Sequence, residues 1–126
     1  MIDVHDNKII SYEVNLQDCK ITLHTVSEEN ESIDIIFSDV LAHGFLREKK
    51  GSIILDINKH SVDSFIKSKK SLLEERKDYA WLMNYKTLDE LREKLINEQY
   101  AYYAMCASYG MNGWVLCKQY EVKLLE

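Results

Sequence analysis

The apolar residues of this chain change their spacing twice along the sequence. Near the N-terminus they occupy every second position, as in Ile10, Tyr12, Val14 and Leu16, with polar residues between them. This period of two indicates a β-strand with one buried face. From about residue 61 the apolar spacing becomes three to four, as in an amphipathic helix, and after residue 100 strand-like segments return. The chain is therefore expected to form strands, then helices, then strands.

Four strands are expected before the helices. Short polar turns separate the alternating segments, and such turns favour antiparallel pairing of neighbouring strands. The expected strands are centred on residues 10–16, 21–23, 33–37 and 52–57.

Two helices are expected in the middle of the chain. The first begins at the N-cap Ser61 and runs to about Tyr79, and the second opens with a capping box made by Thr87 and Glu90. Each helix has one apolar stripe. The first stripe consists of Val62, Phe65, Ile66, Leu72 and Leu73, and the second of Leu88, Leu91, Leu95 and Ile96.

The last quarter of the sequence predicts a closing β-hairpin. A turn centred between Met111 and Asn112 would place Cys106 directly opposite Cys117. The core face of the hairpin would then carry Tyr103, Met105, Ala107, Trp114, Leu116, Tyr120 and Val122. The other face would carry Tyr100, Tyr102, Cys106, Ser108, Cys117, Gln119, Glu121 and Lys123. Tyrosines on such a half-polar face are typical of contact surfaces, with cover by the chain's own loops as the alternative.

The length of the chain fits one domain. A chain of 126 residues buries roughly two-thirds of the surface that it exposes when unfolded. We therefore expect a single α+β domain over residues 1–126, with two helices packed on one face of a predominantly antiparallel sheet of about six strands.

The charges of the chain are segregated along the sequence. Residues 1–45 contain nine Asp and Glu against two Lys, whereas residues 46–77 contain nine Lys and Arg against five Asp and Glu. A folded domain with an acidic and a basic region has an electrostatic polarity that steers association with charged partners. The overall charge of −5 argues against nucleic acid as the main partner, because such binding depends on clustered Lys and Arg.

The sequence also predicts where the protein resides. The first residues lack the basic start and apolar run of a secretory signal, and no segment approaches the 18 apolar residues of a membrane span. The three cysteines, Cys19, Cys106 and Cys117, have no C-x-x-C spacing, so neither a disulfide framework nor a zinc site is indicated. We expect a cytoplasmic protein with reduced thiols and no membrane contact.

No group of residues in the sequence identifies a reaction. His5 and Asp6 would begin a metal site, but no second cluster of ligands is evident. His43 lies near Asp39 and Gly44, where a general base could sit, and a structural histidine in a turn is the alternative. We therefore expect no catalytic residues, no metal and no cofactor, and a protein that is not an enzyme.

Four stretches of the sequence resemble small bacterial proteins that look like immunity proteins of polymorphic toxin systems, including contact-dependent growth inhibition. These stretches are residues 5–12 (HDNKIISY), 34–43 (DIIFSDVLAH), 51–57 (GSIILDI) and 109–116 (YGMNGWVL). The resemblance implies a cytosolic protein that binds and neutralises a cognate toxin domain. Proteins of that kind share no catalytic residues.

The charge pattern and the resemblance lead to the same hypothesis. Many such toxins are nucleases, whose substrate grooves are basic, so an acidic surface would complement them. Two alternatives remain open: a small ligand-binding protein or enzyme that uses the His43 loop, and an adaptor that dimerises through the tyrosine face, the protein being otherwise a monomer or a weak homodimer. The residues expected to contact a partner are Glu28, Glu29, Glu31, Asp34, Asp39, Tyr100 and Tyr102.

Overall fold

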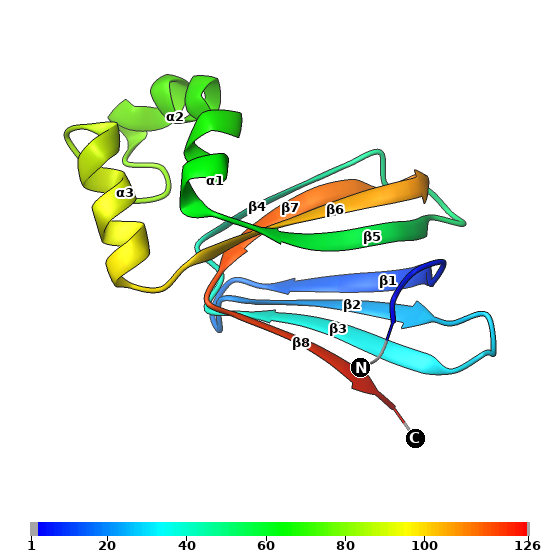
Figure 1. Ribbon diagram of the computed structural model, residues 1–126. Coiled ribbons are helices and arrows are strands. Elements are labelled where there is room, and N and C mark those ends of the chain that lie inside the picture. Colours follow the sequence, from blue (N-terminus) through cyan, green and yellow to red (C-terminus); the bar gives the residue numbers. More distant parts are fainter. Residues whose placement is uncertain (1–2, 126) are drawn as a thin grey trace.

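The computed structural model describes residues 3–125, which form eight strands, three α-helices and one short 3-10 helix, η1 (Figure 1). The strands before the helices are β1 (Lys8–Asn15), β2 (Lys20–Val26), β3 (Ser32–Ser38), β4 (Ala42–Leu46) and β5 (Ile53–His60). The helices are α1 (Val62–Ser68), α2 (Lys70–Arg76), η1 (Lys77–Tyr79) and α3 (Leu88–Asn97). The closing strands are β6 (Ala101–Tyr109), β7 (Asn112–Cys117) and β8 (Gln119–Leu124).

The eight strands form one antiparallel sheet in the order β4-β7-β6-β5-β1-β2-β3-β8. The sheet consists of two four-stranded halves, because β1 and β5 pair at a single described position, Lys8 with Ile53. Figure 1 shows the halves lying over one another, with the chain passing from the upper half to the lower half between β7 and β8. The α+β class and the antiparallel sheet are thus confirmed, with eight strands where about six were expected.

The main core lies between the two half-sheets. The alternation of β2 and β3 points one side chain in two inward, so Ile21, Leu23, Ile35 and Phe37 are almost completely buried. Residues of β6 and β7 face them from the other half. These include Tyr103, Met105, Val115 and Cys117.

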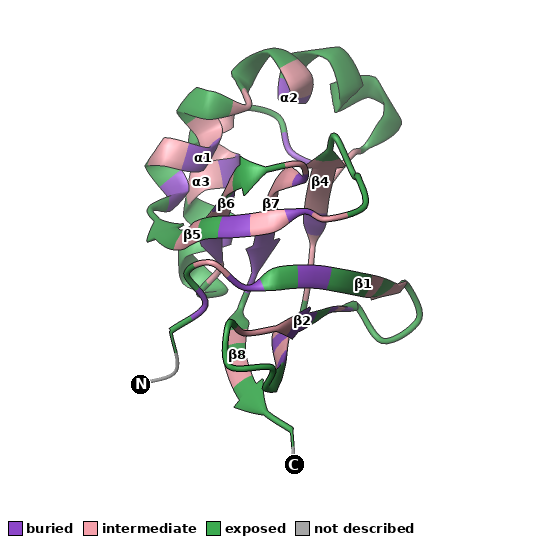
Figure 2. Cartoon of the chain, turned by 90° about the vertical axis from the view of Figure 1, so that its right-hand side faces the viewer, coloured by how far each residue is buried: buried purple, intermediate pink, exposed green. Residues whose placement is uncertain are grey.

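A second core lies between the helices and the outer face of the half-sheet that contains β4, β7 and β6. Phe65 of α1, Leu73 of α2 and Leu91 and Leu95 of α3 are fully buried there. The outward surfaces of the helices are largely exposed (Figure 2). The helices therefore cover one face, as expected, and the order of layers is helices, half-sheet, half-sheet.

A β-bulge in β1 changes which residues of that strand are buried. Ile9 pairs with Thr25 and Ser11 with His24, so Ile10 is the extra residue. Ile9 is consequently buried and Ile10 is 60% exposed, whereas Tyr12 and Val14 face the core beyond the bulge. Leu16, which was expected on the buried face, lies past the end of β1 and is 81% exposed.

The long first helix expected over residues 61–79 is divided in the structure. Ser61 accepts a hydrogen bond from the Ser64 amide, as an N-cap should, but the backbone leaves helical geometry at Lys69 and a new helix begins at Lys70. This change of direction brings Leu73 into the same core as Phe65. The second helix begins after the N-cap Thr87, as expected, since the Glu90 amide donates to Thr87 Oγ1 (3.1 Å). The expected capping box is only half formed, because the Glu90 carboxylate accepts from the Lys86 amide (3.0 Å) and not from the Thr87 amide.

The expected register of the closing hairpin is wrong. Met105 pairs with Gly113 rather than with Lys118, a displacement of five residues, and Cys117 pairs with Ala101 rather than with Cys106. The connection is longer than a tight turn because Met111, which is 2% exposed, inserts into the core between the half-sheets. An odd displacement exchanges the two faces of a strand, so Trp114 and Leu116 face the helices and not the core assigned to them.

Candidate functional site

Acidic side chains gather at one end of the lower half-sheet. The turn between β2 and β3 exposes Glu28, Glu29 and Glu31, and its shape is fixed by hydrogen bonds from the amides of residues 27 and 30. The N-terminal segment, with Asp3 and Asp6, borders the same depression of about 440 Å³. We call these five carboxylates the acidic end.

Strand pairing explains why these two segments meet. Lys8 at the start of β1 pairs with Val26 at the end of β2, so the residues before β1 must lie beside the residues after β2. The N-terminal segment is also tied to the sheet, since the Asp6 amide donates to the Ile54 carbonyl (2.8 Å). Asp3 and Asp6 were not among the residues expected to contact a partner, although antiparallel pairing of β1 with β2 brings them beside the turn.

One histidine accompanies the acidic end. His5 Nδ1 lies 2.5 Å from the Leu55 carbonyl oxygen, and its Nε2 lies 3.4 Å from the Asp6 carboxylate. The carbonyl of Leu55 and the charge of Asp6 both raise the pKa of His5. Five carboxylates against one exposed imidazole leave this end strongly negative at neutral pH.

Asp34 and Asp39 lie outside the acidic end. Asp34 is on β3, where its carboxylate is 2.8 Å from Nδ1 of His24 and only 14% exposed. Asp39 lies beyond the other end of β3, in a turn with positive φ, where its charge helps to raise the pKa of Tyr100. The acidic residues proposed from the sequence therefore divide among three places, and only Glu28, Glu29 and Glu31 share a surface.

The tyrosine face expected on the hairpin lies against the helices. Tyr102 is 7% exposed, and its ring lies edge-on to Phe65 of α1 with 5.5 Å between the centroids. Tyr100 is half-buried beside the same core, with the Lys118 ammonium 5.1 Å from its ring centroid. Burial raises the pKa of both phenols. Cover by the chain's own elements, which are helices rather than loops, accounts for Tyr102.

His43 belongs to a strand and not to a loop. It lies on β4, opposite Val115, and borders a pocket of about 290 Å³ together with Cys19 and Trp81. Burial lowers the pKa of His43, which favours the neutral imidazole. The pocket is slightly smaller than the roughly 300–1,000 Å³ of typical small-molecule sites.

Among residues 3–125, no three His, Cys, Asp or Glu side chains are arranged to hold a metal ion. Within the same residues, no helix has the length and apolar character needed to cross a membrane.

No family model matches this sequence, and no curated protein matches it. The function therefore has to be inferred from the residues of the chain and their geometry.

Proposed function

We propose that the protein is a non-catalytic inhibitor of the immunity type, which binds a basic protein domain through its acidic end. The observation that supports this proposal is the convergence of five carboxylates, from two separate segments, around one 440 Å³ depression. The partner would be a cognate toxin domain, and the inhibitor would act in the cytoplasm. The resemblance of residues 5–12 and 34–43 to immunity proteins led to the same class.

Electrostatics explains how such a surface would act. A nuclease groove must be basic to hold phosphates, so an acidic end that enters it excludes the substrate. Complementary charges accelerate the encounter and select the partner, and the acceleration falls as salt screens the charges. The depression between the two segments would receive one or more basic side chains of the partner.

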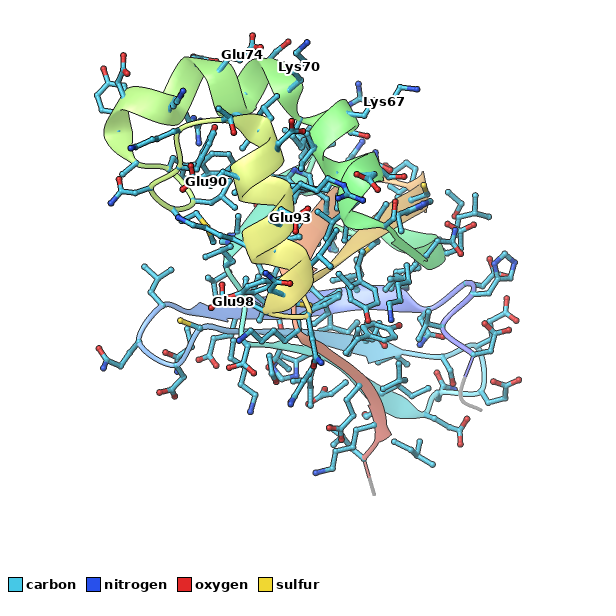
Figure 3. The ribbon with its side chains drawn as sticks, turned by 60° about the vertical axis from the view of Figure 1, so that its left-hand side comes forward. Lys67, Lys70, Glu74, Glu90, Glu93 and Glu98 are labelled. Carbon is cyan, nitrogen blue, oxygen red and sulfur yellow. The ribbon has the colours of Figure 1, made fainter. Side chains whose placement is uncertain are left out.

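A charge-reversal pair of variants tests the proposal. Glu28→Lys/Glu29→Lys/Glu31→Lys reverses the charge of the exposed turn. We expect it to slow association with a basic toxin domain, which would be sought in the adjacent genes, by at least about tenfold at low salt. The matched control reverses three exposed carboxylates on the helical side, Glu74, Glu75 and Glu98, with the same change in net charge. In Figure 3, Glu74 lies on the helices and Glu98 at the end of α3.

The two variants give distinct outcomes in cells that express the toxin domain. Survival with wild type and with the helix control, but death with the turn variant, would support the proposal. Equal protection by both variants would place the interface elsewhere on the molecule. Equal loss with both would show that only net charge matters. Thermal unfolding of both variants should stay close to wild type, because exposed charges contribute little to stability.

A further inference from the structure

A third cavity, opposite in charge to the acidic end, opens at the corner where β1 leaves β5. Its volume is about 530 Å³, within the range of roughly 300–1,000 Å³ that is usual for small-molecule sites. The cavity arises from the sheet itself, because β1 and β5 pair at Lys8 and Ile53 and the bulge at Ile10 then turns β1 away. The loop between β4 and β5 forms its other wall.

Apolar side chains line the inner part of this cavity. Ile9 and Met111 are buried residues of the core between the half-sheets, so the cavity reaches that core. Ile10, which the bulge turns outward, adds an exposed apolar wall. Methionine is flexible and polarisable, which suits it to contact with ligands of variable shape. An unbranched alkyl chain fits such walls.

The charged residues of the cavity are mostly basic. Lys8, Lys49 and Lys50 border it, and the Lys49 ammonium lies 5.1 Å from the ring centroid of Tyr109, outside the lining. The one acid is Glu48, whose carboxylate already accepts a hydrogen bond from the Tyr12 hydroxyl. This local excess of positive charge occurs in a chain whose net charge is −5. It would attract an anionic head group, and ammonium groups suit a carboxylate because they act as mobile point charges.

We propose that this cavity binds a small anionic amphiphile, a carboxylate with an unbranched apolar chain of medium length. The alkyl chain occupies the space beside Ile9, Ile10 and Met111, and the carboxylate lies beside Lys8 and Lys50. This site is separate from the acidic end in residues and in charge. The inference does not depend on the proposed function.

The probe for this proposal is decanoate, used below the concentration at which it forms micelles. Calorimetry and amide chemical shifts should show one decanoate bound, with the largest shifts at residues 8–12 and 48–52. Butanoate has the same head group without the long chain, and decanol has the chain without the charge. We expect each to bind at least about tenfold more weakly than decanoate, since each lacks one of the two contributions.

Two matched pairs of variants locate the site. Lys8→Glu/Lys50→Glu should weaken decanoate binding at least about tenfold, whereas Lys67→Glu/Lys70→Glu, which reverses two exposed lysines on the helices, should leave it almost unchanged (Figure 3). Ile10→Ser should also weaken binding, whereas Leu16→Ser, at another exposed apolar position outside the cavity, should not.

Several outcomes would overturn the proposal. Equal affinity for decanoate and decanol would show that the lysines do not contribute to binding. Equal losses of affinity in the two lysine variants would show that only the overall charge of the protein matters. Shifts confined to the pocket beside His43 would move the site there. Absence of binding at millimolar decanoate would also overturn the cavity proposal. It would not affect the proposed inhibitor function, since the toxin assays use a different surface.

Discussion

Gly44 of β4 lies directly opposite Trp114 of β7, and the indole ring covers it. A Cβ atom added at Gly44 would lie 2.6 Å from Nε1 of Trp114, a distance that real Cβ atoms do not adopt. The indole cannot move freely, because Phe65 and Tyr102 pack against it. Only glycine allows the edge strand and this aromatic group to approach so closely.

We therefore expect Gly44→Ala to destabilise the fold by about 1–3 kcal/mol, as overpacked sites do. Urea unfolding measures the change. Trp114→Phe removes the atom that clashes, so Gly44→Ala/Trp114→Phe should cost less than the sum of the two single changes. Strict additivity would show that the two residues do not restrict one another.

Strands β2 and β3 were predicted from the sequence and β4 was not, and the contact between Gly44 and Trp114 explains the difference. Ile21, Leu23, Ile35 and Phe37 alternate without interruption, so their period is easily recognised. By contrast, β4 has five residues with a glycine at its centre, and it exists because Gly44 can approach Trp114, a residue 70 positions later in the sequence. No local pattern contains that information.

The same limitation explains the errors at Ile10 and in the closing hairpin. A bulge shifts the alternation of β1 by one residue. The bulge depends on how β1 pairs with two other strands, with β2 along its length and with β5 at the corner. The hairpin register depends on Met111 entering a core made by other strands. The composition of the acidic end was predicted in part: the turn glutamates were identified and Asp3 and Asp6 were missed, whereas Asp34 and Asp39, which are near the turn in sequence, lie elsewhere.

The thiols provide a chemical test of the hairpin register. Cys19 and Cys106 are exposed, whereas Cys117 is buried and its thiol pKa is raised to about 12, chiefly by burial. We expect two of the three thiols to react with an alkylating reagent in the native protein, and the third to react only on unfolding. Mass spectrometry of the labelled peptides identifies them. A Cys106–Cys117 bridge after mild oxidation would contradict the observed pairing.

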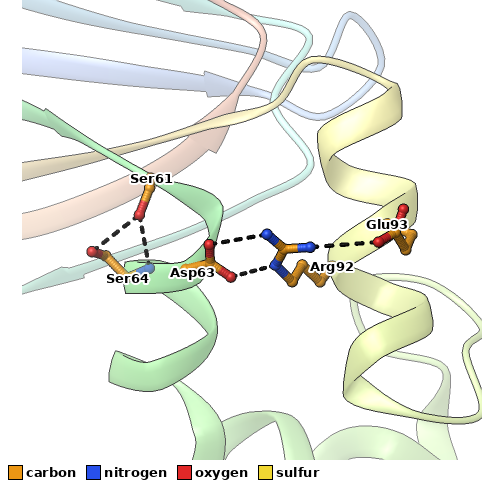
Figure 4. Close-up of polar contacts among 5 residues, drawn as sticks. All are labelled: Ser61, Asp63, Ser64, Arg92 and Glu93. Atoms are coloured by element: carbon orange, nitrogen blue, oxygen red, sulfur yellow. Dashed lines mark hydrogen bonds and ion pairs between the residues drawn. The ribbon is translucent and has the colours of Figure 1, made fainter.

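An ion pair between α1 and α3 should make stability depend on pH in the acid range. Arg92 binds the Asp63 carboxylate through two nitrogens and also contacts Glu93 (Figure 4). The Arg92 guanidinium lowers the pKa of Asp63 below its ordinary value of 3.8. A carboxylate with a lowered pKa in the folded state stabilises that state at neutral pH, and the contribution disappears as the pH falls from 3.8 through the folded-state value.

Asp63→Asn should therefore be less stable than wild type at pH 7 and equal to it in strong acid. The urea midpoint, measured across that range, detects the convergence. Glu93→Gln is the control and should change less, since its carboxylate lies 3.4 Å from Arg92 through one nitrogen. A constant gap between Asp63→Asn and wild type at every pH would show that the ion pair is not its cause.

A buried hydrogen bond holds the N-terminal part of the acidic end in place. Asn7 is 2% exposed, and its Nδ2 donates to Thr25 Oγ1 (3.0 Å), which itself donates to the Ile33 carbonyl. Asn7→Ala leaves a buried hydroxyl without one partner, and we expect it to cost about 1–3 kcal/mol. Thr25→Val should cost a similar amount.

Because Asn7 adjoins Asp6, the same change should loosen the segment that carries Asp3 and Asp6. Hydrogen exchange at the Asp6 amide should become faster in Asn7→Ala, while exchange in β3 stays slow. Protection of that amide equal to wild type would show that the bond to Ile54 alone fixes the segment.

The chain passes from β7 to β8 through Lys118, so the last strand belongs to the half-sheet whose other strands are made first. This arrangement determines the order in which the strands can pair during synthesis on the ribosome. The strands β1, β2 and β3 are neighbours in sequence and can pair as soon as they emerge. The partner of β3 on its other side is β8, which is made after the other seven strands. Until then β3 presents an unpaired edge of backbone hydrogen-bonding groups, on which two nascent chains can join. The yield of native protein should therefore depend on how quickly residues 119–124 clear the exit tunnel.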